Sequence, residues 1–124
     1  MKRNMELIRL ILLAVEKSEA NQPIDKYTDD ELKYNRQLAI EASLLEGKVL
    51  ESGGSLSEVP AAVIIKKLTW SGHDFLDAIR KESVWGKIKS DFKEESLETI
   101  VSVAKQLAEG WAKKKVEAIL NDSL

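Results

Sequence analysis

The chain has 124 residues, of which 44% are hydrophobic and 32% charged, and its net charge is −2. A chain of this length buries enough apolar surface to fold without a disulfide or a structural metal. It has no cysteine, so disulfides and thiolate chemistry are excluded. No apolar run approaches the roughly 18 residues that a membrane-spanning helix needs. We therefore expect a cytoplasmic protein with no membrane partner, no cofactor, no metal and no small-molecule substrate.

The first predicted helix covers about residues 2–18. Its apolar residues recur at helical spacing, but they cover more than one face of the helix. The residues that widen this apolar arc are Leu7, Leu10 and Leu13. A helix that is apolar on more than one side must be covered by the rest of the domain, by the last helix or by a second subunit.

A capping box marks the start of the second helix. Thr28 is followed three residues later by Glu31, a pair that satisfies the first backbone N–H groups of a helix. We expect this helix to begin at Asp29 and to end near Ala42 or Ser43. Its predicted inward face is formed by Tyr34, Leu38 and Ala42, and its predicted outward face carries Lys33, Asn35, Arg36 and Gln37.

Two predicted strands follow, over residues 44–50 and 63–68. The second is rich in β-branched residues, and a polar loop with Gly53, Gly54 and Pro60 separates the two strands. This pattern predicts a hairpin with a long tip. Lys66 and Lys67 lie near its base.

The stretch LTWSGHDFLDAIR, residues 68–80, predicts the end of a strand followed at once by a helix. Thr69 is the expected N-cap, and Trp70, Phe75, Leu76 and Ile79 recur at helical spacing. A further short helix is expected over residues 84–92. Ser96 is expected to cap a last helix that continues to about residue 121 and carries the stripe Leu97, Ile100, Ala104, Leu107 and Trp111.

This order of elements predicts an α+β fold: a winged-helix-like domain with a two-stranded β-hairpin and a long C-terminal helix. We expect the winged-helix-like domain to span residues 1–95. Residues 96–124 are expected to form a helical extension that packs on this domain or on a partner.

Three stretches of the chain resemble domain-of-unknown-function family 2513. They are MKRNMELIRLILLAVE, YTDDELKYNRQLAIEASLLEG and LTWSGHDFLDAIRKESVWGKIK, within residues 1–92. The resemblance implies a small bacterial protein of winged-helix character, often found in prophages or other mobile elements, with no established activity. Two positions depart from the family pattern. Asn35 stands where a histidine is expected, and Ser43 where a helix-ending glycine is expected.

The residue types typical of catalysis have structural explanations here. His73 is the only histidine, and with Asp74 and Asp77 it lacks the second histidine or cysteine that a transition-metal site would use. Its expected role is structural hydrogen bonding. The carboxylate pairs lie at helix starts, where the helix dipole favours them. Trp70, Trp85 and Trp111 are expected to pack in the core. We therefore expect no enzymatic activity.

Two functional hypotheses remain. In the first, the protein associates with double-stranded DNA as a regulator or accessory factor of a phage or mobile element. The candidate DNA-binding residues are Lys33, Asn35, Arg36, Gln37, Lys66 and Lys67. In the second, the protein is an interaction or homodimerisation module that does not bind DNA. The candidate interface residues are Leu7, Leu10, Leu13, Leu107 and Trp111.

Overall fold

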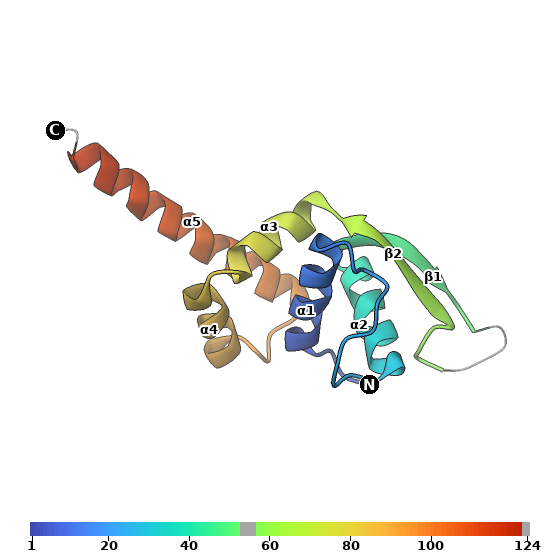
Figure 1. Cartoon of the computed structure of the whole chain (residues 1–124). Coiled ribbons are helices and arrows are strands. Elements are labelled where there is room, and N and C mark those ends of the chain that lie inside the picture. Colours follow the sequence, from blue (N-terminus) through green and yellow to red (C-terminus); the bar gives the residue numbers. More distant parts are fainter. Residues whose placement is uncertain (53–56, 123–124) are drawn as a thin grey trace. The chain divides into compact units, whose positions relative to one another are not determined.

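The computed structural model of the protein describes residues 1–52 and 57–122, and it shows an α+β fold (Figure 1). The elements in chain order are α1 (Met5–Glu16), α2 (Asp29–Glu41), β1 (Leu45–Leu50), β2 (Ala62–Leu68), α3 (Trp70–Ile79), α4 (Glu82–Asp91) and α5 (Leu97–Asp122). The predicted class, hairpin and long C-terminal helix are confirmed. Gly53 and Gly54, predicted at the hairpin tip, lie outside the described residues.

The chain forms two compact units, Met1–Leu76 and Asp77–Leu124, and the boundary falls within α3. The predicted division into residues 1–95 and 96–124 stays a prediction. In the first unit, α1 packs on α2 and β2, and α2 packs on both strands. The segment 17–28 between α1 and α2 contains turns but no helix. It therefore lacks the short helix that precedes a recognition helix, and the winged-helix assignment also stays a prediction.

Both ends of α2 are formed by hydrogen bonds between residues that are close together in the sequence. The Thr28 hydroxyl accepts the Glu31 N–H, and the Glu31 carboxylate accepts the Thr28 N–H, as predicted. Beyond α2, Ser43 adopts the left-handed conformation with φ of 62°. Its N–H donates to the carbonyl of Ile40, and the next N–H donates from Leu44 to the carbonyl of Ala39. This is a Schellman motif with serine at the position that glycine favours.

The buried face of α2 differs from the predicted one. The residues buried along it are Leu32, Asn35, Arg36 and Ala39, while Tyr34, Leu38 and Ala42 are only half-buried. The predicted face was wrong because helical spacing alone does not reveal that the segment 17–28 binds to this helix. The carbonyl of Gln22 in that segment accepts a hydrogen bond from Arg36.

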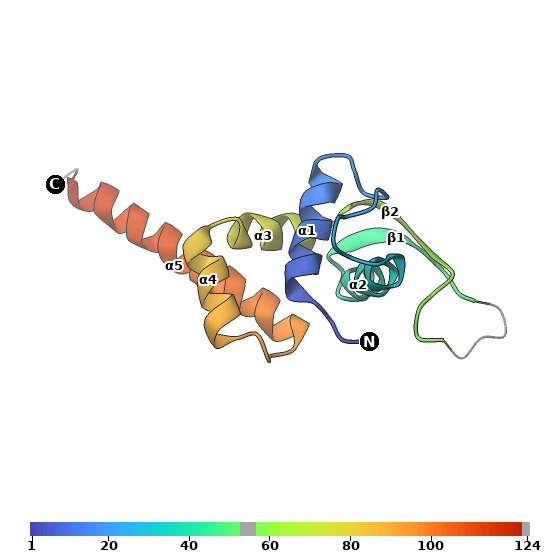
Figure 2. The ribbon, with the colours of Figure 1, turned by 60° about the horizontal axis from the view of Figure 1, so that its bottom comes forward.

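The two strands pair antiparallel, with Lys48 opposite Ile64 and Glu46 opposite Lys67. The register shifts between Glu46 and Gly47, so Lys66 is the extra residue of a β-bulge. Gly47 is needed at this position, because a Cβ there would lie 2.4 Å from the carbonyl oxygen of Ile64. Figures 1 and 2 both show the hairpin extending beyond α1 and α2.

One edge of β2 is covered by a side chain. The amide of Asn21 donates to the carbonyl of Ile65 and accepts the N–H of the same residue. These are the two hydrogen bonds that a neighbouring strand would make at Ile65. The side chain therefore blocks the pairing of β2 with another strand at this point.

In the second unit, α4 packs on α5. Trp85 of α4 is buried, as predicted, and so are Ile100 and Ala104 in the first half of α5. The hydroxyl of Ser96 accepts the N–H of Thr99, which confirms the predicted cap of α5. From Glu109 to Asp122 every residue of α5 is exposed. Among the described residues, no helix has both the length and the apolar character needed to cross a bilayer.

Candidate nucleic-acid interface

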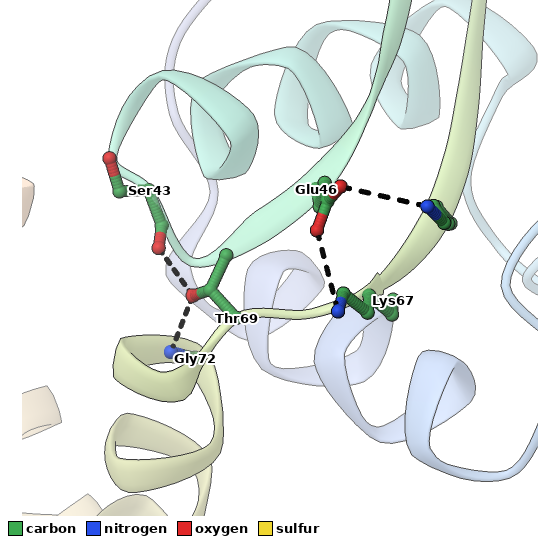
Figure 3. A network of polar contacts seen from close by, with 6 residues as sticks. Ser43, Glu46, Lys67, Thr69 and Gly72 are labelled. Atoms are coloured by element: carbon green, nitrogen blue, oxygen red, sulfur yellow. Dashed lines mark hydrogen bonds and ion pairs between the residues drawn. The ribbon is translucent and has the colours of Figure 1, made fainter.

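The base of the hairpin is joined to the start of α3 and the end of α2 by one threonine (Figure 3). The Thr69 hydroxyl donates to the carbonyl of Ser43 and accepts the N–H of Gly72, at 2.9 Å for the latter. The Thr69 N–H donates to the carbonyl of Leu44 at 3.1 Å. Thr69 is therefore the predicted N-cap of α3, and it also fixes where the hairpin begins and ends.

Gly72 allows α3 to approach this junction closely. A Cβ on Gly72 would lie 1.9 Å from the carbonyl oxygen of Leu44, far inside van der Waals contact. Any side chain at this position would push the first turn of α3 away from the residues that Thr69 holds. The glycine of the LTWSGHDFLDAIR stretch thus has a structural role.

The β-bulge gives the hairpin two consecutive exposed lysines. In a regular strand, Lys66 and Lys67 would point to opposite faces of the sheet, but both are exposed here. The two ammonium groups lie 3.8 Å and 3.7 Å from the Glu46 carboxylate oxygens (Figure 3). All three side chains are more than half exposed, so these ion pairs contribute little to stability.

A third lysine, absent from the predicted site, completes this surface. Lys48 of β1 is exposed and lies directly across the hairpin from the exposed Ile64. An open hollow of about 460 Å³ is lined here by Glu46, Gly47, Lys48, Ile64 and Lys66. The sequence signal that could have identified Lys48 was its place two residues after Glu46 in the predicted strand, since side chains two apart in a strand share a face. We call Lys48, Lys66 and Lys67 the hairpin lysines.

Two of the α2 residues predicted to bind DNA are partly accessible to solvent. Lys33 is partly exposed, and its ammonium group lies 3.0 Å from the carboxylate of Asp29. Gln37 is half-buried. The first turn of α2 also carries Asp29, Asp30 and Glu31. An acidic first turn repels phosphates, so this end of the helix is a poor surface for DNA.

The prediction that Asn35 contacts DNA is wrong, because its side chain is buried, with 2% of the residue exposed. Its amide oxygen accepts the N–H of Asn4 at 2.8 Å, and its amide nitrogen donates to the carbonyl of Glu31 at 2.9 Å. Asn4 is itself the N-cap of α1, since its side chain accepts the N–H of Leu7. Asn35 therefore ties the start of α1 to α2.

The prediction for Arg36 is wrong for the same reason, since 6% of this residue is exposed. Its terminal nitrogen Nη2 donates to the carbonyl of Gln22 at 2.7 Å, and its Nε has no hydrogen-bond partner among the described residues. Burial lowers the pKa of the Arg36 guanidinium from its ordinary value, and the negative charge of Asp29 opposes this shift. Arg36 holds the segment 17–28 against α2 and is not available to a phosphate.

The predicted interface residues divide between the two units. Leu7 is fully buried, so its prediction as an interface residue is wrong, while Leu10 and Leu13 are half-buried. Leu107 is also half-buried, and Trp111 is 46% exposed. The prediction that Trp70 and Trp111 pack in the core is wrong. Trp111 is accessible, and Trp70 at the start of α3 is 86% exposed.

His73 is an exposed residue of α3, as are Asp74 and Asp77. The Asp77 carboxylate lies 3.3 Å from the guanidinium of Arg80 on the next turn. Within residues 1–52 and 57–122, no group of three or more histidine, cysteine, aspartate or glutamate side chains is placed to hold a metal ion. Within residues 68–80, Thr69 and Gly72 therefore form the junction described above, while His73, Asp74 and Asp77 face solvent.

Comparison with known proteins relates the chain to sequences of unassigned function. The family model described as "Hypothetical protein (DUF2513)" matches residues 2–98. A protein of Haemophilus influenzae described as "Uncharacterized protein" is 36% identical over 115 residues, which cover 88% of this chain and 93% of the relative. No solved structure matches the chain.

Proposed function

The chain belongs to the DUF2513 family of hypothetical proteins, and from this premise we propose that it is a non-enzymatic, DNA-associated protein. Its contact with the duplex is made by the hairpin lysines rather than by α2. The bacterial and mobile-element setting implied by the family resemblance makes a regulator or accessory factor of a phage or mobile element the corresponding biological role. Such a protein acts in the cytoplasm.

The observation that carries this proposal is the clustering of Lys48, Lys66 and Lys67 on an exposed two-stranded hairpin. Two-stranded ribbons fit the grooves of duplex DNA, and lysine ammonium groups bind phosphates as point charges. The bulge at Lys66 supports the proposal, because it brings two adjacent lysines out of the sheet together. A hairpin that extends beyond α1 and α2 can reach the DNA backbone without a clash from these helices (Figure 2).

Glu46 lowers the net charge of this surface in the free protein, yet it does not prevent binding. Exposed ion pairs are worth roughly 0–1 kcal/mol, so a phosphate can displace the carboxylate from either lysine at small cost. The Glu46 carboxylate competes with phosphates for the two ammonium groups and repels the DNA backbone. Its replacement by glutamine should therefore strengthen binding to duplex DNA.

The test is fluorescence anisotropy of the full chain with a mixed-sequence duplex across a salt series. Three phosphate contacts predict a slope of about −2.7 for log K against log salt concentration. The triple variant K48A/K66A/K67A should bind weakly, with a slope close to zero. Glu46→Gln should bind more tightly than the unmodified chain.

The matched control is K17A/K87A/K93A, which removes the same charge from lysines that are exposed elsewhere on the protein. This control should bind DNA almost as the unmodified chain does. Equal losses in both triple variants would mean that only net charge matters, and the hairpin assignment would be overturned. No binding by the unmodified chain at low salt would overturn the DNA-associated function itself.

A further inference from the structure

The second half of α5 is a helix without cover among the described residues. Ile119 is 65% exposed, and Val116 and Leu120 are exposed to a similar degree. In both views this part of α5 runs beyond α4, the helix on which its first half packs (Figures 1 and 2). Isolated helices of this length are marginal in water, so a second surface is needed to stabilise it.

Five residues with apolar side chains lie on one side of this helix, and the exposed Leu120 lies apart from them. Ala108, Ala112, Val116 and Ile119 follow each other at three- and four-residue spacing, and Trp111 borders them. We call these five residues the α5 strip. Its N-terminal part carries the small Ala108 and Ala112, and its C-terminal part carries the larger Val116 and Ile119.

We propose that the α5 strip pairs in antiparallel orientation with the α5 strip of a second copy of this chain. In the proposed register, Ala112 lies opposite Lys115 of the second copy. The same register then places Ala108 opposite Ile119, a small residue against a large one. It also places Lys105 opposite Asp122, so that opposite charges meet at both ends of the paired region.

Charge decides between the two orientations of such a pair. A parallel, in-register pair would place Lys105, Lys115 and Asp122 each against its own copy, and like charges at such positions repel. The antiparallel pair replaces two of these three repulsions with Lys105–Asp122 attractions. Lys115 meets the small Ala112 and can extend its ammonium group to water. Charge therefore favours this antiparallel pair over the parallel, in-register pair.

Cysteine cross-linking tests both the partner and the register, since the natural chain has no cysteine. Two full-length variants are made, Ala112→Cys and Lys115→Cys, both at exposed positions. They are oxidised separately and as an equal mixture. The antiparallel register brings residue 112 of one copy next to residue 115 of the other, within the reach of a disulfide. The mixture should therefore give several-fold more cross-linked dimer than either variant alone.

Light scattering over a concentration series supplies the second measurement. The mass of the unmodified chain should rise from 13.9 kDa toward twice that value. Ile119→Lys should keep the protein monomeric, while the control Asn121→Lys, which adds the same charge on the opposite side of α5, should still dimerise. Reversal of one charge by Lys105→Asp should weaken the dimer, and the double change K105D/D122K should restore it.

Three outcomes would overturn the proposal. A monomer at every concentration, with no cross-linked product, would mean that the strip is covered within the chain or by a different protein. Dimers that form equally well with Ile119→Lys would mean that another surface pairs. Preferential cross-linking of each cysteine variant with itself would mean a parallel pair.

Discussion

The hydroxyl of Thr69 donates a hydrogen bond to the carbonyl of Ser43, which lies 26 residues earlier in the chain. The same oxygen accepts the N–H of Gly72 and so caps α3. One side chain therefore couples the end of α2, the base of the hairpin and the start of α3. This coupling holds the hairpin lysines in a fixed place relative to the helices of the first unit.

Thr69→Val should lower the free energy of unfolding by about 1–3 kcal/mol, because it removes both hydroxyl hydrogen bonds at nearly constant volume. Thr69→Ser, which keeps the hydroxyl, should recover most of this loss. Urea denaturation followed by circular dichroism measures both. Equal stability of the valine and serine variants would show that the hydroxyl contributes nothing to the junction.

Gly72→Ala should be strongly destabilising, because the added methyl group would overlap the carbonyl oxygen of Leu44. Overpacking of this kind costs about 1–3 kcal/mol or more. The matched control is Gly86→Ala in α4, where a Cβ would meet nothing within 4 Å. That change should stabilise the protein by up to about 1 kcal/mol through helix propensity. If both substitutions had the same sign, the close approach at Gly72 would be refuted.

Ser43→Gly should stabilise the protein by about 0.5–1 kcal/mol. Left-handed backbone costs a residue with a Cβ roughly 1–2 kcal/mol, part of which glycine loses again through its freer unfolded state. Ser18, which has φ of 64° beyond the end of α1, offers a second site with the same geometry. The thermal midpoints of the two single variants and of the double variant measure the effect, and the two gains should add.

Asn35→His should fold, and its stability should depend on pH. A neutral imidazole can accept the N–H of Asn4 with one nitrogen and donate to the carbonyl of Glu31 with the other, whereas an imidazolium has no acceptor. Burial therefore lowers the pKa of this histidine in the folded state below the unfolded value of about 6.5. The stability of the variant is therefore full above about pH 6.5 and is lost as the pH falls below that value.

The measurement for this variant is urea denaturation at pH 7.5 and pH 5, with the unmodified chain at the same two pH values as the control. The variant should lose more stability than the control between these conditions. Asn35→Leu removes both hydrogen bonds and should be less stable than Asn35→His at pH 7.5. A pH-independent difference between the variant and the control would contradict the predicted hydrogen bonds of the imidazole.

The sequence alone determined the features of this protein that depend on neighbouring residues. The capping box at Thr28 and Glu31, the caps at Thr69 and Ser96 and the helical stretches were predicted, because each arises from groups within a few residues. The hairpin was predicted from two strand-like runs on either side of a polar loop. The DNA hypothesis also came from the sequence, but it rested mainly on Lys33, Arg36 and Gln37 of the second helix, with Lys66 and Lys67 as further candidates.

Only the tertiary structure decided which polar residues are accessible. Asn35 and Arg36 look like exposed helix residues in the sequence, but they bind backbone groups at Asn4 and Gln22, which are 31 and 14 residues away. The bulge at Lys66 likewise depends on the register between two strands. Burial and register are set by contacts between distant segments, and periodicity in one segment carries no information about the other.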